Sequence, residues 1–319
     1  MEIDPNYLVL RESNIVGPEL AKRGKVRDVY RIGGGRLIFV TTDRISTHDV
    51  VYKDCIPHKG FGLTQTTIYA FSNTEDIVEN HFLKSPDPNC MIVLGTDPYP
   101  IEVVVRGILT GSAWRAYQSD GEVCGIKIPK GMKKNQKLDK PIITPTTKAE
   151  TGHDEPVTHS QARKIVGPVW DPITEVAIEL FERGDQMAYK QGGMLADTKF
   201  EFGKRGKYDL ILIDEALTHD SSRWLTVDNW REAFEEGKNP DWIDKQPVRD
   251  YSESKGFRGE GEPPRLPEDI IRGATERVLK VYYLLSGEEL ELPQEPPTNR
   301  RIVKNLRKVL VNNKSRSQL

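Results

Sequence analysis

Residues 194–215, with the sequence MLADTKFEFGKRGKYDLILIDE, constrain the fold more than any other stretch of this chain. Two runs with the composition of β-strands flank a short basic turn, which predicts an antiparallel hairpin. In the first run Asp197, Lys199 and Glu201 stand at every second position, so an extended strand places them on one face. The second run, residues 210–213, is wholly apolar and predicts a buried strand that ends in two acidic residues.

Charged groups beside a buried strand cost free energy unless each one is paired with an opposite charge or bound to a cation. The hairpin therefore has two interpretations. It is either a solvated hairpin with a cross-strand ion pair, or a Mg²⁺–phosphate site with Lys199 held over it. Mg²⁺ is usually bound by one or two carboxylates together with substrate phosphates, which suits the second interpretation. The hairpin alone leaves both open.

The composition narrows the class of protein. The chain has 319 residues, of which 37% are hydrophobic and 29% charged, and this predicts a globular protein of one large or two moderate domains. A formal net charge of −2 gives no overall field that would attract nucleic acid or an anionic membrane. The three cysteines lack CxxC spacing and fit a reducing compartment. We find no secretory pattern and no apolar run of about 20 residues, and we expect a cytoplasmic protein.

The order of the predicted elements indicates an α+β fold with two lobes. The predicted strands of the first third are 26–32, 36–42 and 101–107. The predicted helices are 63–72, 160–190 and 269–285, the second of them broken near its start by Gly167-Pro168. We therefore expect a small, mostly antiparallel N-terminal lobe over residues 1–115. A larger, helix-rich lobe with a central sheet is expected over residues 116–319.

Polar clusters lie at the ends of several predicted strands, and each has a local as well as a functional explanation. The basic turn Gly24–Arg27 is either an ordinary turn or a phosphate-binding loop, because glycine lets backbone N–H groups approach an anion. Arg44 and Ser46 form either a capped turn or a clamp for a carboxylate, since a guanidinium offers a bidentate fork. Arg106, followed by Ser112, is either a solvent-facing arginine at a strand end or part of a phosphate-monoester site.

Two further clusters lie later in the chain. Residues 144–155 carry many polar groups without an apolar period, which predicts a loop, and its single histidine does not make a zinc site. Residues 214–223 end in Ser222 and Arg223, which suit either a capped turn or an anion cradle. Polar clusters in both halves of the chain predict a cleft lined from both lobes.

Seven stretches of the chain stand in an order that is typical of one enzyme family. They are GKVRDVY (24–30), TDRIS (42–46), IEVVVRGILTGSAW (101–114), TPTTKAETGHDE (144–155), LADTKFEFG (195–203), LIDEALTHDSSRW (212–224) and DKQPVRDY (244–251). Together they resemble the phosphoribosylaminoimidazole-succinocarboxamide synthase (SAICAR synthetase) family. The chain departs from the family's usual pattern at Thr47-His48, His219 and Pro247, and none of these departures removes a residue of a ligand-binding type.

The resemblance implies an ATP-grasp-like architecture related to protein kinases, with ATP held between two lobes. It implies an ATP-dependent carbon–nitrogen ligase of de novo purine biosynthesis. Such an enzyme joins L-aspartate to the carboxylate of 5-amino-1-(5-phospho-D-ribosyl)imidazole-4-carboxylate and releases SAICAR, ADP and phosphate. The implied partners are these small-molecule substrates together with Mg²⁺, and the oligomeric state is left open.

The same resemblance implies roles for individual residues. Those implied for ATP are Gly24, Lys25, Val26 and Arg27 over the phosphates, with Glu102 and Val104 passing the adenine as the hinge between the lobes. The implied Mg²⁺ ligands are Glu201 and Asp214. The implied catalytic residues are Asp197 and Lys199, at the imidazole end of the ribonucleotide. The residues implied for substrates are Arg106, Ser112 and Arg223 at the ribonucleotide phosphate, Asp220 and Ser222 nearby, and Arg44, Ser46, His153 and Asp154 for aspartate.

Two other functions stay open on the sequence. A kinase-like phosphotransferase would use the same cleft to act on a small phosphorylated metabolite, but its ADP release would not depend on aspartate. The basic stretch from Arg300 to Leu310 is either a binding element for nucleic acid or a membrane surface, or a terminal helix that packs its apolar side on the protein.

Overall fold

The computed structural model describes residues 7–148, 154–206 and 210–314 of the chain. The strands are β1 (Glu19–Arg23), β2 (Arg27–Ile32), β3 (Arg36–Thr41), β4 (Arg44–Thr47), β5 (Val50–Cys55), β6 (Phe82–Asp87), β7 (Cys90–Leu94), β8 (Asp97–Leu109), β9 (Glu122–Val123), β10 (Ile126–Lys127), β11 (Gln136–Ile143), β12 (Thr146–Thr147), β13 (Gly193–Lys204), β14 (Ile211–Ile213) and β15 (Ser222–Thr226). The helices are α1 (Lys59–Ser72), α2 (Gly111–Asp120), α3 (His159–Val166), α4 (Trp170–Tyr189), α5 (Val227–Glu235), α6 (Gln246–Ser254), α7 (Glu268–Ser286) and α8 (Asn299–Lys314).

The first sheet is antiparallel and comes from the first third of the chain. Its strand order is β1-β2-β3-β7-β6. The predicted hairpin between β2 and β3 is confirmed, with Ile32 opposite Arg36 and the three glycines forming the turn between them. Next to this sheet, β4 and β5 form a separate two-stranded ladder.

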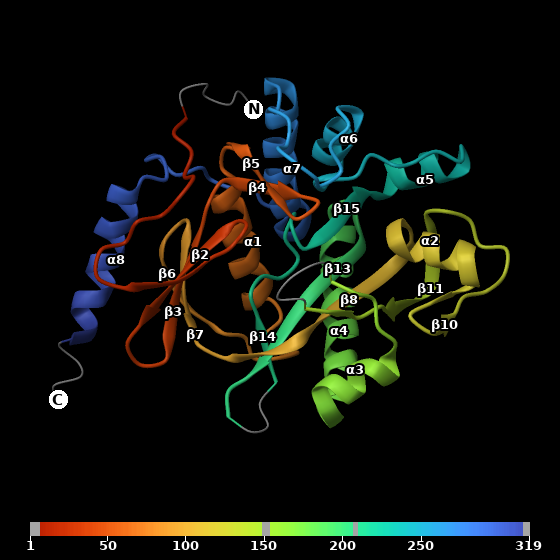
Figure 1. Ribbon diagram of the computed structural model, residues 1–319, viewed down its shortest axis with the longest axis horizontal. Coiled ribbons are helices and arrows are strands. Elements are labelled where there is room, and N and C mark those ends of the chain that lie inside the picture. The colour runs from red at the N-terminus through yellow and green to blue at the C-terminus, as the bar shows by residue number, and fades with distance from the viewer. Residues whose placement is uncertain (1–6, 149–153, 207–209, 315–319) are drawn as a thin grey trace.

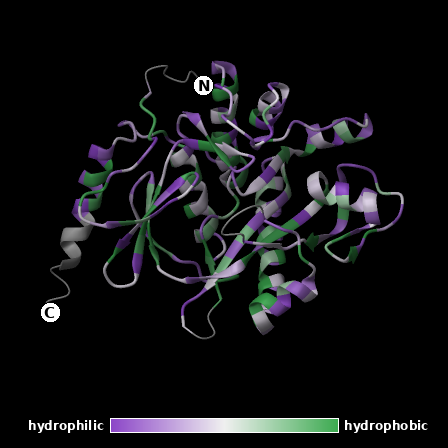
Figure 2. Cartoon of the chain, in the orientation of Figure 1, coloured by the Kyte–Doolittle hydropathy of each residue, from purple (hydrophilic) through white to green (hydrophobic). Residues whose placement is uncertain are grey.

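The basic helix α8 packs on the first sheet (Figure 1). Its Ile302 and Leu306 are buried in one cluster with Ile38 and Ile92 of the sheet. Hydrophilic and hydrophobic residues alternate along the helix (Figure 2), as expected for a helix with one face on the protein. The interpretation of this stretch as a packed terminal helix is therefore confirmed.

The second sheet is built on the antiparallel pair of β8 and β13. Its order is β11-β8-β13-β14, with β12 beside β8 and β15 beside β13. Phe200 and Phe202 of β13 lie in the large core cluster together with Phe181 of α4. Because side chains alternate along a strand, Lys199 and Glu201 point to the opposite face of the sheet. The alternation predicted for this strand is confirmed.

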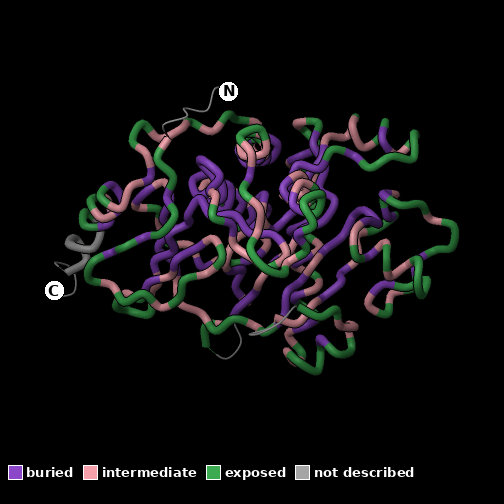
Figure 3. The backbone as a smooth tube through the Cα atoms, turned by 45° about the horizontal axis from the view of Figure 1, so that its top comes forward, coloured by how far each residue is buried: buried purple, intermediate pink, exposed green. Residues whose placement is uncertain are grey.

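Helices join the two sheets. Helix α1 packs on β3 of the first sheet and on α7, and α7 in turn packs on α4, which covers β13 (Figure 1). Buried residues are concentrated in this central region (Figure 3). The predicted break at Gly167-Pro168 is confirmed, because a 3₁₀ turn (η1, Gly167–Val169) separates α3 from α4. No helix within the described ranges is both long and apolar enough to cross a membrane.

The α+β class with antiparallel sheets is confirmed, and the hinge expected at Glu102 and Val104 stays a prediction. The chain leaves the first sheet after β7 and enters the second at β8. Glu102 and Val104 pair with Glu201 and Lys199 of β13, so they lie within the second sheet. The division of the chain at residue 115 stays a prediction.

Candidate active site

Residues from both sheets line one cavity of about 1190 Å³. The polar clusters from the two halves of the chain therefore converge, as predicted. The predicted site residues along its wall are Gly24, Lys25, Val26, Arg27, Ser46, Glu102, Val104, Arg106, Ser112, Asp154, Asp197, Lys199, Glu201, Asp214, Asp220, Ser222 and Arg223. Arg44 does not line the cavity, and His153 lies outside the described residues.

Strand β13 sets the order of the charged groups along the cavity. Asp197, Lys199 and Glu201 follow one another on the cavity face, and a rise of about 3.3 Å per residue puts Asp197 and Glu201 roughly 13 Å apart along the strand. In the register of the sheet, Asp197 lies opposite Arg106 of β8 on one side and Arg223 of β15 on the other. The strand thus has an arginine end and a carboxylate end, with Lys199 between them.

At the arginine end, Asp197 holds both guanidinium groups. Arg106 Nη1 donates to Asp197 Oδ2 at 3.0 Å, and Arg223 Nε donates to Asp197 Oδ1 at 3.0 Å. Arg106 also donates to Thr144 Oγ1 at 2.7 Å and to Ser112 Oγ at 3.1 Å. Burial raises the pKa of Asp197, but the two arginines lower it more, so the carboxyl group is ionised. The result is a fixed pair of cations that matches a phosphate group.

Arg223 is also fixed by the start of α2. A side chain at Gly111 would put its Cβ atom 2.8 Å from Arg223 Nη1, and Gly111 has a φ of 58°, so only glycine is free of strain here. The guanidinium lies over the ring of Trp242 at 5.4 Å. The close approach of Arg223 therefore explains why the GILTGSAW stretch has a glycine at position 111.

In the middle of the strand, Lys199 pairs with Glu102 of β8. Lys199 Nζ donates to Glu102 Oε1 at 2.6 Å. Burial lowers the pKa of Lys199, but Glu102 and Glu201 raise it more, and the net shift is upward. Lys199 is therefore a permanent cation on the cavity wall, suited to stabilising negative charge.

At the carboxylate end, Glu201 of β13 lies opposite Ile213 of β14, and Asp214 follows directly. Arg27 pairs with Asp214 and also contacts Glu215, with 3.2 Å between Nη2 and Oε2. Burial and the charge of Asp214 raise the pKa of Glu201. The pKa of Asp214 is raised by burial and lowered more strongly by cations, Arg27 first among them, for a net downward shift.

Two neighbouring carboxylates fit the way in which Mg²⁺ is bound beside nucleotide phosphates. Such sites use one or two protein carboxylates, and substrate phosphates and water complete the octahedron. No group of three or more His, Cys, Asp or Glu side chains suited to a metal occurs within the described ranges. Within the described part of the chain, Glu201 and Asp214 would therefore hold Mg²⁺ only together with nucleotide phosphates and water.

Asp220 forms ion pairs with two lysines. Its Oδ2 lies 2.7 Å from Lys59 Nζ and 3.6 Å from Lys245 Nζ. Burial raises the pKa of Asp220, but the lysines lower it more, and the net value is well below the usual range. Burial lowers the pKa of Lys245. Asp220 thus holds two ammonium groups beside the cavity.

Several lining residues were not singled out from the sequence. Lys148, which pairs with Glu201, and Lys245 lie inside two of the seven stretches, so the motifs contained a signal for them. His81 lines the cavity as well, and no motif marks it. Lys59, at the start of α1, does not line the cavity itself, and only the tertiary structure brings its side chain to Asp220 on the cavity wall.

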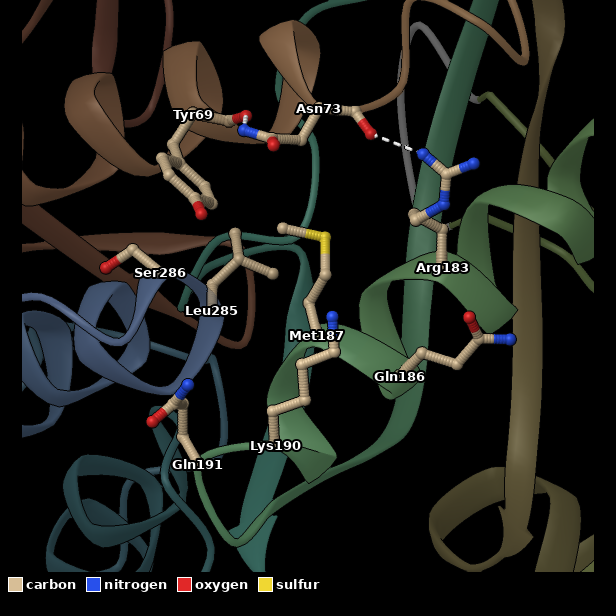
Figure 4. Close-up of a pocket in the computed structure, with 9 residues that line it drawn as sticks. All are labelled: Tyr69, Asn73, Arg183, Gln186, Met187, Lys190, Gln191, Leu285 and Ser286. Carbon is tan, nitrogen blue, oxygen red and sulfur yellow. Dashed lines mark hydrogen bonds between the residues drawn. The ribbon is translucent and has the colours of Figure 1, made fainter.

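A second, smaller cavity of about 400 Å³ lies where α1, α4 and α7 meet. Figure 4 shows Arg183 donating to the carbonyl oxygen of Asn73, at 2.8 Å, on one side of this space. Arg183 also pairs with Asp76. This cavity shares no lining residue with the first one and contains none of the predicted site residues.

Comparison with known proteins identifies the family that has this arrangement. Residues 20–265 match the family model for SAICAR synthetase. The chain belongs to the SAICAR synthetase family. The resemblance seen in the seven stretches is therefore confirmed, and it extends over most of the chain.

Members of the SAICAR synthetase family from several bacteria are similar over nearly their whole length. The phosphoribosylaminoimidazole-succinocarboxamide synthase of Thermodesulfovibrio yellowstonii is 40% identical over 296 residues, which are 88% of this chain and 99% of that protein. The one from Bacteroides fragilis is 40% identical over 306 residues, 94% of this chain and 97% of that protein. Among solved structures, the SAICAR synthase of Saccharomyces cerevisiae complexed with SAICAR matches with a TM-score of 0.79 and 33% identity, covering 89% of this chain and 100% of that one.

Proposed function

We propose that this protein ligates L-aspartate to the carboxylate of 5-amino-1-(5-phospho-D-ribosyl)imidazole-4-carboxylate, with ATP as the co-substrate and SAICAR, ADP and phosphate as products. The relatives are named after this activity, and the reaction belongs to de novo purine biosynthesis. The observation that carries the proposal is the order of charges along β13. An arginine pair, a lysine and a carboxylate pair follow one another on one wall of a single cavity.

That order fits the two anionic substrates placed end to end. The ribonucleotide phosphate binds Arg106 and Arg223, with Ser112 beside them. Its imidazole carboxylate then lies toward Lys199. The phosphates of ATP lie under Gly24–Arg27, and Glu201 and Asp214 would hold Mg²⁺, which would neutralise charge on these phosphates. The assignment of the adenine to Glu102 and Val104 stays a prediction, since these residues pair with Glu201 and Lys199.

The chemistry follows from the fact that a free carboxylate has no good leaving group for attack by an amine. An amine does not displace oxide from a carboxylate at neutral pH, so the carboxylate oxygen first attacks the γ-phosphorus of ATP. ADP leaves and an acyl phosphate forms. The amine of aspartate then attacks the acyl carbon, phosphate departs and the amine loses a proton. Mg²⁺, when bound, neutralises charge on the phosphates.

The side chains of the site position the reactants and stabilise charge, and no protein nucleophile is required. Lys199 is a cation at every physiological pH and stabilises the oxygens of the transferred phosphoryl group. Alignment of two bound reactants can account for about 7–11 kcal/mol of the barrier. Ser46 and Asp154, which line the cavity, stay assigned to aspartate. Ser222 stays assigned to substrate binding, and Asp220 acts through the two lysines that it holds.

Two finer descriptions belong to the same proposal. The two-sheet arrangement around one nucleotide cavity is of the ATP-grasp-like type, and the protein works in the cytoplasm. Three unpaired cysteines, two of them buried, support a reducing compartment.

The test is a coupled ADP-release assay in which each substrate is left out in turn. We expect ADP only when ATP, the ribonucleotide and aspartate are all present, with SAICAR formed in equal amount. ADP release that does not depend on aspartate would identify the kinase-like phosphotransferase instead.

A further inference from the structure

Thr42, Asp43 and Arg44 join β3 to β4, and all three are buried. The family resemblance implied that Arg44, together with Ser46, binds aspartate. Arg44, however, is 5% exposed and does not line the cavity. Its hydrogen bonds lead to a different part of the protein.

The guanidinium of Arg44 holds the backbone of the loop Gly24–Arg27. Its Nη2 donates to the carbonyl oxygen of Gly24 at 2.9 Å, and its Nε donates to that of Lys25 at 3.1 Å. It is kept in place by the buried carboxylate of Asp28, with 2.8 Å between Nη2 and Oδ1, and by the carbonyl oxygen of Arg11 at 2.6 Å. A planar fork with several donors makes all of these bonds at once, which a lysine cannot do.

Thr42 completes the support of the loop. Its Oγ1 donates to the carbonyl oxygen of Val26 at 2.7 Å, and its backbone N–H donates to the same oxygen at 2.9 Å. Three successive loop carbonyls are thus held by Arg44 and Thr42. In a trans peptide the C=O and N–H groups point in opposite directions, so the N–H groups of Lys25 and Val26 face away from this support. Backbone N–H groups arranged in this way are suited to phosphate oxygens.

Asp43 connects the same segment to α1. Its Oδ1 accepts the N–H of Gly60 at 2.9 Å, and its Oδ2 accepts the N–H of Leu10 at 2.7 Å. A Cβ atom at Gly60 would come within 2.3 Å of the Thr41 carbonyl oxygen, so glycine permits the close contact. The residue before Gly60 is Lys59, whose side chain reaches Asp220. The segment therefore fixes the loop relative to the opposite wall of the cavity.

We propose that Arg44 and Thr42 are positioning residues that shape the loop Gly24–Arg27 for the phosphates of ATP, and that Arg44 does not bind aspartate. This inference rests on the proposed function in one respect, the assignment of the loop to ATP.

Three variants test the inference. Arg44→Lys keeps the positive charge beside Asp28 but loses the fork, and it is therefore the variant most suited to keep the fold. Thr42→Val removes only the hydroxyl bond to Val26, because the backbone N–H still donates to that oxygen. Arg31→Met, on the exposed side of β2, is the matched control on the same sheet.

The measurements are the KM values of the three substrates, kcat, and the Kd of a non-hydrolysable ATP analogue. We expect Arg44→Lys to raise the KM of ATP and the Kd of the analogue by about tenfold or more, since a displacement of about 1 Å costs up to 100-fold. Thr42→Val should shift the same two constants in the same direction by a smaller factor. The KM values of aspartate and of the ribonucleotide should stay within about twofold of the wild type, a pattern that general destabilisation does not produce.

Two results would overturn the inference. A rise confined to the KM of aspartate would show that Arg44 binds aspartate. An unchanged KM of ATP and an unchanged Kd of the analogue would show that Arg44 does not shape the loop for ATP. Failure of the proposed function is a separate result, because it would appear in the wild type as missing SAICAR. The Kd of the ATP analogue would still decide the role of Arg44 in that case.

Discussion

Glu201 lies on β13 and Asp214 directly follows the adjacent antiparallel strand β14, and the charge of Asp214 adds to burial in raising the pKa of Glu201. Both face the cavity, and the nearest partners of both are cations, Lys148 for Glu201 and Arg27 for Asp214. Two carboxylates that disfavour one another's charge are stabilised by a divalent cation, which is the physical basis for placing Mg²⁺ here.

Neutralising one of these acids should therefore stop the reaction. We expect Asp214→Asn to lower kcat by about 100-fold or more, because a bound metal supplies several kcal/mol of charge stabilisation and each 1.36 kcal/mol is tenfold in rate. Chelation of the metal should abolish ADP release, and added Mg²⁺ should restore it. The control is Asp228→Asn, which changes an exposed acid on α5. Near-normal turnover of Asp214→Asn would remove Asp214 from the metal site.

Asp197 should act through the arginines that it holds. Asp197→Asn leaves the buried Arg106 and the half-buried Arg223 next to each other without their shared carboxylate, so the free energy of unfolding should fall by about 3–5 kcal/mol. The KM of the ribonucleotide should rise more than that of ATP, because the arginines belong to the phosphate end. Urea unfolding and steady-state kinetics measure the two effects.

The matched control for Asp197 is Asp76→Asn. Asp76 also makes a bidentate pair with an arginine, Arg183, but its side chain is 64% exposed. We expect a much smaller loss of stability there, because solvent screens an exposed ion pair. Equal losses of stability in the two variants would contradict the role of burial.

His81 should make the protein less stable at mildly acidic pH. Burial is the main cause that lowers the pKa of His81 to about 4, while an unfolded chain has a value near 6.5. The unfolded state therefore binds the proton more readily between about pH 4 and pH 6.5, and stability falls as the pH drops through this range. At pH 5 the loss from His81 amounts to about 2 kcal/mol relative to pH 7.5.

His81→Asn tests this pH dependence, because asparagine does not titrate and still offers an N–H donor to the Asp214 backbone near the position of Nδ1. The measurement is the free energy of unfolding in urea at pH 5 and pH 7.5 for both proteins. The decrease in the free energy of unfolding from pH 7.5 to pH 5 should be smaller in the variant by about 2 kcal/mol. The same difference in both proteins would show that His81 does not titrate as inferred.

Arg301 should stabilise the first sheet from the C-terminal helix. It pairs with Asp87 at 2.9 Å and also donates to Asn89, and the Asp87 side chain is fully buried. Arg301→Met leaves that carboxylate without its cation, so we expect the free energy of unfolding to fall by about 3–5 kcal/mol. The neighbouring Arg300→Met changes an exposed residue and should alter stability by less than about 0.5 kcal/mol. Thermal unfolding of the two variants side by side distinguishes these outcomes.

Local patterns were sufficient for much of the fold. Alternation along residues 194–204 placed Asp197, Lys199 and Glu201 on one face, and the β2–β3 hairpin and the break between α3 and α4 followed from glycine and proline. These features depend on residues close together in the chain, and the conformational preferences of such residues do not depend on the rest of the fold. The ordered motifs likewise determined the family.

Pairing between distant segments needed the tertiary structure. The register of β13 with β8 and β15 put Asp197 between two arginines and set Glu102 and Val104 opposite Glu201 and Lys199. Arg44 is the clearest case. An arginine is suited to binding a carboxylate of a substrate, but in the folded protein its guanidinium donates to the carbonyl oxygens of Gly24 and Lys25. The sequence by itself determined which chemical groups are present and which face of each strand they occupy. Only the tertiary structure decided their partners, since side chains of equal chemistry are distinguished by long-range packing and burial.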